Sequence, residues 1–422
     1  MTTADLIVVG AGPAGSSASI FASRLGMDVR VLEKHKRGRD KFCGGGITYG
    51  VEKLMVEKIG KEISETIELR IGGVVVFSPS GRELVLRFSE ELRRYGGLVR
   101  RSVFDKKLME IAESEGAELK ESKEVIKVKT NDGGVVVTTR DGEEFKGRYL
   151  IIATGSDDKL GEQLGIPPLG KKGMGGCWGT EVRFDVEKLK DKWKKRWGIL
   201  PIFLFFGPVP SGYAWIFPKR EHLNIGIGTD ISNFRNHEER FSSFLKKAAE
   251  SGVLSELEVR HDRAATIPFG DVPRSRTYSE NGRALLVGDA AGFVHPVTGE
   301  GIYGAIHGSL IAARMLKVAL DREDPSLLKK YEERCWSEFG EDSLGYGKKI
   351  AKLLYGSSFM MEMGVKVVMC DEEAARRLAL LLAHYDADVS RKMYERISGL
   401  NLVGLALKSL KAPKRAVYDV YP

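Results

Sequence analysis

Hydrophobic residues near the start of the chain follow two different periods, which together are typical of a βαβ unit. Leu6–Val9 are consecutively apolar, as in a strand that is buried on both faces of a parallel sheet. The following segment SSASIFASRLG predicts a helix that ends at Gly26, and MDVRVLE predicts a second strand that ends at Glu33. The pattern therefore predicts strand, helix and strand in that order.

The turn between the first strand and the helix carries the glycines of a dinucleotide-binding motif. Gly10 permits the tight turn, Gly12 lets a pyrophosphate approach the backbone, and Gly15 lets the helix pack closely on the strand. The helix N-terminus offers free N–H groups and a positive dipole end to phosphates. Glu33, at the end of the second strand, can accept hydrogen bonds from ribose hydroxyls, and its charge disfavours a 2′-phosphate there.

Further strands and helices that fit the same domain lie much later in the chain. The pattern predicts a helix at residues 104–115 and a strand at 117–121, followed by a β-meander whose last apolar strand is 149–153. Another apolar strand, 284–287, leads into the motif GDAAG, a glycine-rich loop and a helix. We therefore expect a nucleotide-binding domain that is discontinuous in sequence.

These motifs, in this order, resemble the glutathione-reductase-type FAD fold, in the branch that includes aromatic hydroxylases and geranylgeranyl reductases. The resemblance implies FAD as the cofactor, with Arg101 near its phosphates and Asp289 on the ribitol hydroxyls. The next helix N-terminus would face the N1–C2=O edge of the isoalloxazine, where its positive end stabilises the anion formed on reduction. The other glycine cluster, Gly170–Thr180, follows no apolar strand, so a dedicated NAD(P)H domain is not expected.

Three further stretches resemble the geranylgeranyl reductase family in particular. PSGYAWIFPK (Pro210–Lys219) resembles its P-x-x-Y-x-W-x-F-P signature, and DKFCGGGIT (Asp40–Thr48) resembles its cysteine-glycine segment. HPVTGEGIYGAIHG (His295–Gly308) resembles its loop and helix beside the flavin, and the whole resemblance spans roughly residues 5–320. It implies an FAD enzyme that reduces C=C bonds of a prenyl chain such as geranylgeranyl, in a membrane lipid precursor, by hydride from reduced flavin N5 plus a proton.

The resemblance places the cofactor-binding residues in the glycine turn, the second strand, the cysteine-glycine segment, the meander end and the flavin loop. They are Gly10, Gly12, Pro13, Ala14, Gly15, Glu33, Lys34, Cys43, Gly44, Arg101, Gly155, Gly288, Asp289, Gly299, Gly301 and Ile302.

A face of large aromatics is the candidate substrate wall. Tyr213, Trp215 and Phe217 alternate along a predicted strand and therefore share one face. An isolated double bond has no polar handle, so shape and apolar contact must position it in a dry tunnel. We expect these rings to line that tunnel together with His295 and Pro296; the alternative is that the rings are ordinary core of a sheet.

Cys43 and Gly44 are the candidate catalytic residues, and Cys43 is the main candidate for the proton donor. Three glycines follow it, and they would let its thiol and the backbone at Gly44 approach a flavin ring closely. The alternative is that Cys43 is a small buried hydrophobic residue. His295 and Glu300 are further candidates, which could instead satisfy the backbone of their loop.

The expected architecture is mixed α/β. A Rossmann-like FAD-binding domain with a β-meander comprises residues 1–60, 100–156 and 280–325. A substrate domain built on an antiparallel sheet comprises 61–99 and 157–279. Residues 326–422 are expected to form a mostly helical C-terminal region.

Composition adds a question about the membrane. The net charge of +8 favours acidic partners, and no nucleic-acid motif accompanies it. No secretory signal and no run of the ~18 apolar residues needed for a span is evident, which predicts a cytoplasmic protein that is either soluble or peripheral on the inner face of the membrane. Trp193 and Trp197 among lysines, and the basic, apolar segment 398–415, predict contact with anionic lipid, unless each is a solvated face over core.

Two other functions fit an FAD site: a flavin-dependent monooxygenase, and an electron-transfer flavoprotein that passes electrons to quinone. The prenylated lipid is the expected partner on the first interpretation. The electron donor stays open among NAD(P)H, ferredoxin and quinol.

Overall fold

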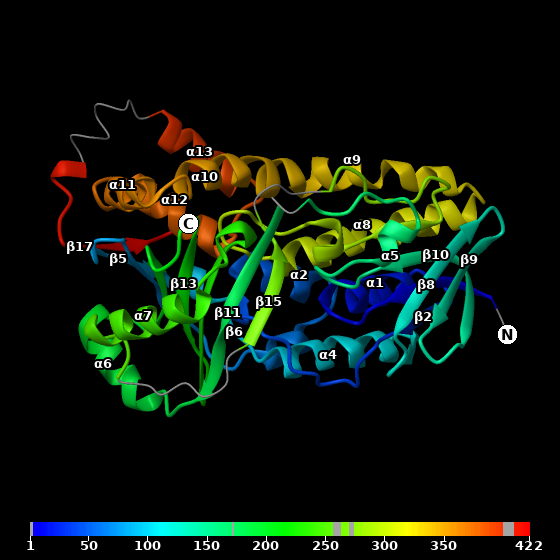
Figure 1. The fold of residues 1–422 in the computed structure, drawn as a ribbon, viewed down its shortest axis with the longest axis horizontal. Coiled ribbons are helices and arrows are strands. Elements are labelled where there is room, and N and C mark those ends of the chain that lie inside the picture. The colour runs from blue at the N-terminus through cyan, green and yellow to red at the C-terminus, as the bar shows by residue number, and fades with distance from the viewer. Residues whose placement is uncertain (1–2, 171–172, 256–262, 270–273, 400–408) are drawn as a thin grey trace.

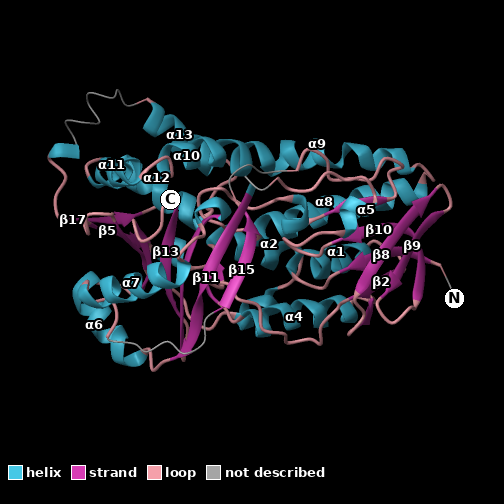
Figure 2. Cartoon of the chain, in the orientation of Figure 1, coloured by secondary structure: helices cyan, strands magenta, loops and turns pink. Residues whose placement is uncertain are grey.

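The computed structural model describes residues 3–170, 173–255, 263–269, 274–399 and 409–422. Two β-sheets lie towards opposite ends of an elongated molecule, and a series of helices runs along one side of it (Figure 1). Figure 2 shows the same division, with strands gathered at the two ends and helices between and above them.

The first sheet contains the predicted βαβ unit and the meander. Its order is β7-β2-β1-β10-β9-β8, with β16 also paired to β10. β1, β2, β7, β10 and β16 pair in parallel, whereas β8 and β9 are antiparallel. The bounds are β1 Ala4–Val9, β2 Val29–Leu32, β7 Glu118–Lys120, β8 Val125–Asn131, β9 Gly134–Thr139, β10 Glu144–Ile152 and β16 Ala284–Leu286. The predicted α/β class with a Rossmann-like domain is confirmed.

Three helices pack beside the first sheet: α1 (Pro13–Arg24), α4 (Arg101–Ser114) and α8 (Ile302–Asp321). The side chains of α1 are mostly small, so neighbouring helices can pack closely against it. Ser309 Oγ of α8 donates a hydrogen bond to the Ala14 carbonyl of α1 (2.8 Å). α4 begins three residues before its predicted start at 104, because its first turn buries the charged Arg101, which an apolar pattern does not count.

The second sheet has eight strands in the order β15-β11-β14-β13-β12-β4-β5-β17. The predicted antiparallel pairing holds except for β4 with β12 and β5 with β17, which are parallel. The bounds are β4 Gly73–Phe77, β5 Glu83–Phe88, β11 Met174–Arg183, β12 Pro201–Phe206, β13 Gly212–Pro218, β14 His222–Asp230, β15 Arg263–Pro268 and β17 Arg415–Val420.

Helices cover both faces of this sheet. α6 (Glu187–Trp197) and α7 (His237–Glu250) pack on one face. The other face meets α10 (Gly347–Leu354), α11 (Ser358–Met369), α12 (Glu372–Ala383) and α13 (Val389–Ser398). Other short elements include α2 Tyr49–Lys58, α3 Glu90–Arg93, α5 Leu160–Gln163, α9 Tyr331–Cys335, a π-helix Trp336–Tyr346, and the paired strands β3 Gly46–Ile47 and β6 Gly97–Leu98.

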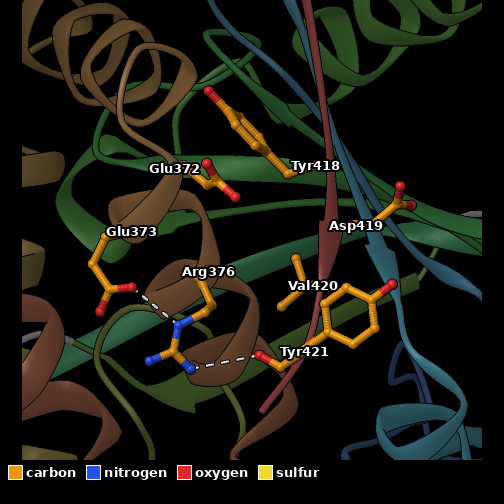
Figure 3. Close-up of a pocket in the computed structure, with 7 residues that line it drawn as sticks. All are labelled: Glu372, Glu373, Arg376, Tyr418, Asp419, Val420 and Tyr421. Atoms are coloured by element: carbon orange, nitrogen blue, oxygen red, sulfur yellow. Dashed lines mark hydrogen bonds and ion pairs between the residues drawn. The ribbon is translucent and has the colours of Figure 1, made fainter.

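The C-terminal region is mostly helical, as predicted, but its last strand belongs to the second sheet. β17 pairs with β5 along six residues, from Arg415 opposite Glu83 to Val420 opposite Phe88. A surface pocket of about 310 Å³ opens between this strand and α12 (Figure 3). Arg376 in this pocket points towards Glu373 and the Tyr421 carbonyl, and no predicted cofactor or substrate residue lines it.

The prediction that Trp193 and Trp197 lie at a lipid interface is wrong. Both side chains are 0% exposed, and each indole packs edge-on against Phe203 with ring centroids 5.0 Å apart. Trp193 Nε1 donates to the Val253 carbonyl (2.9 Å), and Trp197 Nε1 donates to Glu83 (3.1 Å). The i,i+4 spacing places both indoles on the buried face of α6, while lysines occupy the solvent face.

The second predicted membrane segment, 398–415, lies largely outside the described residues. Among the residues that the structure describes, no helix combines the length and the apolarity needed to cross a bilayer.

We predict that Trp193→Ala lowers the free energy of unfolding by about 3–5 kcal/mol, because it removes a fully buried indole from the core under the second sheet. Urea unfolding measures this change. Lys192→Ala, at the neighbouring exposed position, is the matched control and should change stability by less than about 0.5 kcal/mol. A small effect of Trp193→Ala would contradict the assignment of this ring to the core.

Candidate functional site

The glycine turn after β1 has one packed side and one open side. A Cβ atom at Gly10, where φ is +96°, would lie 2.5 Å from the Ala153 carbonyl oxygen. A Cβ at Gly15 would lie 1.8 Å from the Gly10 carbonyl oxygen, so these two glycines are required by close packing. Among the described residues, a Cβ at Gly12 would meet only the Arg39 guanidinium, at 3.6 Å, and one at Gly155 would meet nothing within 4 Å. The open side leaves room for a pyrophosphate against the backbone.

Glu33 is fixed next to this turn. Its side chain is buried; Oε2 accepts a hydrogen bond from the Ala11 N–H (2.7 Å), and Oε1 accepts one from the His35 N–H (3.0 Å). The carboxylate therefore lies at the end of β2 and faces the glycine turn, where the motif requires an acceptor for ribose. Lys34, the next predicted cofactor residue, is exposed beside it.

Two arginines bring positive charge to the same turn. Arg101 is buried and donates two hydrogen bonds to Asp105, at 2.7 and 2.9 Å. Burial lowers the pKa of Arg101, but the charge of Asp105 and contact with Cys43 outweigh it, so the pKa is raised and the guanidinium stays charged. Arg39 lies 3.4 Å from Asp105 and 3.6 Å from the Cβ position of Gly12. Arg39 also lies 3.9 Å from Glu33, so the carboxylates of Asp105 and Glu33 hold both guanidinium groups beside the glycine turn.

The flavin loop returns to this turn from the far end of the chain. Gly288 has φ +62°, and a Cβ there would lie 2.8 Å from the Ala14 Cβ. The carboxylate of Asp289 lies 3.9 Å from Lys41 Nζ and beside Gly301, whose Cβ position is 2.8 Å from Asp289 Oδ1. The predicted cofactor residues from three distant segments therefore lie together around the start of α1 and α8.

Glu300 caps α8. Its Oε1 accepts the N–H groups of Ile302 (2.6 Å) and Tyr303 (2.9 Å), two of the donors that the helix N-terminus would otherwise leave open. Burial, followed by the nearby charge of Asp289, raises the pKa of Glu300 to about 7 despite these hydrogen bonds. A titratable carboxyl group thus occupies the end of α8 that the sequence assigned to the flavin edge.

His295 supports the loop and packs towards the C-terminal helices. Its Nδ1 accepts the Val297 N–H (3.2 Å), and its Nε2 lies 3.2 Å from Ser390 Oγ, which assigns the ring proton to Nε2. Burial and the neighbouring His384 lower the pKa of His295 to about 3, so the imidazole is neutral at pH 7. Pro296 packs with it against Gly347 of α10.

The aromatic face of β13 covers the cysteine-glycine segment and the flavin loop. Tyr213 Oη donates to the Thr298 carbonyl, next to Gly299. The Phe217 ring carbons lie 2.9 Å from the Cβ position of Gly44, so a side chain at Gly44 would collide with the ring. The three rings do share one face, as predicted, and that face lies at the junction of the two sheets rather than inside either one.

The thiol of Cys43 lies in this junction. Its Sγ accepts the Gly45 N–H (3.4 Å) and interacts with the guanidinium of Arg101. Cys177 on β11 is a neighbour that the sequence did not single out, because its glycine cluster fits no motif. Burial, followed by proximity to Cys43, raises the pKa of the Cys177 thiol to about 12. The pKa of Tyr213 is also raised, by burial and then by the two thiols, so the phenol keeps its proton.

A buried charged network supports the aromatic face from behind. Lys219 is 0% exposed, and its Nζ lies 3.0 Å from both carboxylate oxygens of Glu181. Asn224 donates to Glu181 (3.1 Å) and accepts from Trp215 Nε1 (2.8 Å). Lys219 Nζ also lies 3.3 Å from the Cβ position of Gly45. Lys219 continues the two-residue period of the aromatics, a signal that could have identified it.

Comparisons with known proteins agree with this geometry. A family model described as an FAD binding domain matches residues 3–339. Digeranylgeranylglycerophospholipid reductase 2 of Methanopyrus kandleri is 32% identical over 364 residues, which cover 83% of this chain and 86% of that protein. The digeranylgeranylglycerophospholipid reductase of Methanocaldococcus jannaschii is 31% identical over 363 residues, with coverage of 83% and 86%.

Among solved structures, a geranylgeranyl bacteriochlorophyll reductase-like protein from Thermoplasma acidophilum superposes with a TM-score of 0.79. It is 22% identical and covers 98% of this chain and 100% of its own. The chain is an FAD-binding protein, and it belongs to the family of the digeranylgeranylglycerophospholipid reductases.

The residues of the site fit FAD. The uncovered backbone at Gly12, the cations of Arg39 and Arg101 and the carboxylate of Glu33 suit the adenosine diphosphate part. Asp289, which follows β16 and lies beside the start of α8, offers an acceptor for ribitol hydroxyls.

We predict that Glu300 gives the protein a pH-dependent stability. The folded-state pKa of about 7 exceeds the ordinary 4.5, so the folded protein binds more protons between these values and loses stability as the pH rises through them. Relative to Glu300→Gln, which cannot titrate, the wild type should lose up to about 3 kcal/mol across this range.

Urea unfolding from pH 4.5 to 8, at constant flavin content, measures the difference between the two proteins. Glu110→Gln, at an exposed position on α4, is the control and should follow the wild-type curve. Parallel curves for the wild type and Glu300→Gln would contradict the assignment.

Proposed function

We propose that this protein is an FAD-dependent oxidoreductase acting on CH–CH groups, which reduces the C=C bonds of a prenyl chain, such as geranylgeranyl, in a membrane lipid precursor. The observation that carries the proposal is the aromatic face of β13, which lies directly on the cysteine-glycine segment and the flavin loop. Relatives named for reduction of digeranylgeranylglycerophospholipid, at 31–32% identity over most of the chain, support it.

FAD, when bound and reduced, supplies the hydride for one carbon of the double bond. The protein's part is to hold that bond at a fixed place. Tyr213, Trp215 and Phe217 offer large apolar faces, and the tunnel wall that they form excludes water from the alkene. Gly44 and Gly46 carry no side chain, so the Phe217 ring can approach the backbone of the cysteine-glycine segment closely.

Cys43 Sγ supplies the proton for the second carbon. Breaking the S–H bond leaves a thiolate, which the adjacent Arg101 guanidinium stabilises and which solvent reprotonates after the step. Hydride and proton together add across one double bond, so the substrate gains two hydrogens. The raised pKa values of Cys177 and Tyr213 keep both groups protonated, so they serve as neutral neighbours of the thiol.

We also propose the division of labour between domains. Residues 1–60, 100–156 and 280–325 bind the cofactor, and residues 61–99 and 157–279 bind the prenyl chain. Residues 326–422 support the substrate sheet, to whose edge β17 belongs.

The test is anaerobic. The FAD-loaded protein is reduced with dithionite, which replaces the physiological donor (NAD(P)H, ferredoxin or quinol), and geranylgeranyl-bearing lipid is added. We expect the flavin to reoxidise and the lipid to gain two mass units for each bond reduced. Flavin that stays reduced until oxygen is admitted would indicate a monooxygenase, and reoxidation by quinone alone would indicate an electron carrier.

We predict that Cys43→Ser slows lipid-dependent flavin reoxidation by about 100-fold or more, because a general acid contributes at least this factor. FAD content, read from flavin absorbance, should be unchanged. Cys177→Ser, which alters the neighbouring thiol, is the matched comparison and should retain most of the rate. Equal rates for Cys43→Ser and the wild type would remove Cys43 from the proton step.

A further inference from the structure

We propose that the turn joining α10 to α11 docks on an anionic lipid bilayer. This docking tip comprises residues 348–360. The proposal rests on the proposed function in one respect, namely that the substrate is a membrane lipid, and it identifies how the protein reaches that substrate. The docking tip takes the place of α6 as the candidate membrane contact, because the tryptophans of α6 are buried.

The docking tip exposes large apolar side chains. Leu353 is 42% exposed, Phe359 is 68% exposed and Met360 is 37% exposed. All three fall within eight residues, at the last turn of α10 and the first turn of α11. Single exposed apolar residues are ordinary on a protein surface, but three that are adjacent across one turn form a patch that favours an apolar partner.

The charge of the docking tip is entirely positive. Residues 343–361 contain Lys348, Lys349 and Lys352 and no aspartate or glutamate. Glu362, the first acid after the tip, is already engaged with Ser80 (2.7 Å) and Lys366 (3.4 Å). Exposed Phe, Leu and Met flanked by lysines suit insertion into the headgroup region of an anionic membrane.

The base of the docking tip is bonded to the site. Tyr355 Oη donates to the Val297 carbonyl (2.6 Å), one residue before the carbonyl that accepts from Tyr213. Ser211, next to β13, donates to the Tyr355 carbonyl (3.1 Å). In Figure 1 α10 and α11 lie above the second sheet, and they pack on the same face as Tyr213 of β13. A prenyl chain that leaves a bilayer at the tip therefore starts beside the aromatic face.

A second copy of the chain is a less suitable occupant. A symmetric contact through this patch would bring the exposed Lys349 and Lys352 of one copy against the same lysines of the other, and residues 343–361 contribute no carboxylate to that contact. An anionic membrane satisfies both the apolar and the charged groups of the tip.

The test is co-sedimentation of the FAD-loaded, full-length protein with phosphatidylglycerol or phosphatidylcholine vesicles. We expect binding to phosphatidylglycerol that weakens with salt, and at least about tenfold weaker binding for the triple variant Leu353→Ser/Phe359→Ser/Met360→Ser. Lys352→Glu, which keeps the apolar residues, should also weaken it. The matched control is Leu25→Ser/Val103→Ser/Ile126→Ser, three similarly exposed residues of the first domain, which should bind as the wild type does.

Flavin absorbance confirms that each variant is folded. The proposal would be overturned if the wild-type protein does not bind phosphatidylglycerol vesicles, or if the triple variant binds them as well as the wild type does. A dimer that dissociates in the triple variant on gel filtration would assign the patch to self-association instead and would also overturn it.

Activity separates this proposal from the proposed function. With prenyl lipid dispersed in detergent, the triple variant should match the wild type; with the same lipid in vesicles, it should be slower. If neither protein reduces the lipid in detergent, the proposed function fails, while the vesicle-binding result still decides the role of the docking tip.

Discussion

The contact between the aromatic face of β13 and the cysteine-glycine segment is the constraint on which the rest of the site depends. The Phe217 ring occupies the space into which any side chain at Gly44 would project, 2.9 Å from its Cβ position. Close packing of this kind tolerates little change, because interiors deform poorly. The second sheet, through β13, is thereby held at a fixed distance from the cysteine-glycine segment. Cys43 lies in that segment and its thiol interacts with Arg101, while Tyr213 bonds the flavin loop to the same aromatic face.

A buried hydrogen-bond network fixes the orientation of the aromatic face as well as its distance from the cysteine-glycine segment. Lys219, Glu181 and Asn224 form a buried network that holds the Trp215 indole by its N–H group. Burying an ammonium and a carboxylate costs solvation energy, which their mutual attraction and hydrogen bonds must offset, so such a pair is weak evidence for stability. Its effect here is orientation, since Trp215 has one acceptor and Lys219 also contacts the glycine segment.

The sequence predicted the cofactor half of the molecule well because its signals are local. Glycines, apolar strands and Glu33 obey spacing rules that backbone geometry imposes. It failed where tertiary context decides. The indoles of Trp193 and Trp197 fall on the same helical face whether that face meets lipid or core, and their burial beneath the second sheet could not be read from spacing. The joining of β17 to β5 and the proximity of Cys177 to Cys43 likewise depend on residues distant in sequence.

The most direct test of this account is a double-mutant cycle at the junction. The dissociation constant of a geranylgeranyl lipid is measured by flavin absorbance for the FAD-loaded wild type, Gly44→Ala, Phe217→Ala and the double variant. We expect Gly44→Ala to weaken lipid binding by about tenfold or more without loss of FAD, and to have little further effect once Phe217 is alanine, because the collision is then relieved. Unchanged lipid binding by Gly44→Ala, or full additivity of the two changes, would contradict the claim that this contact shapes the substrate site.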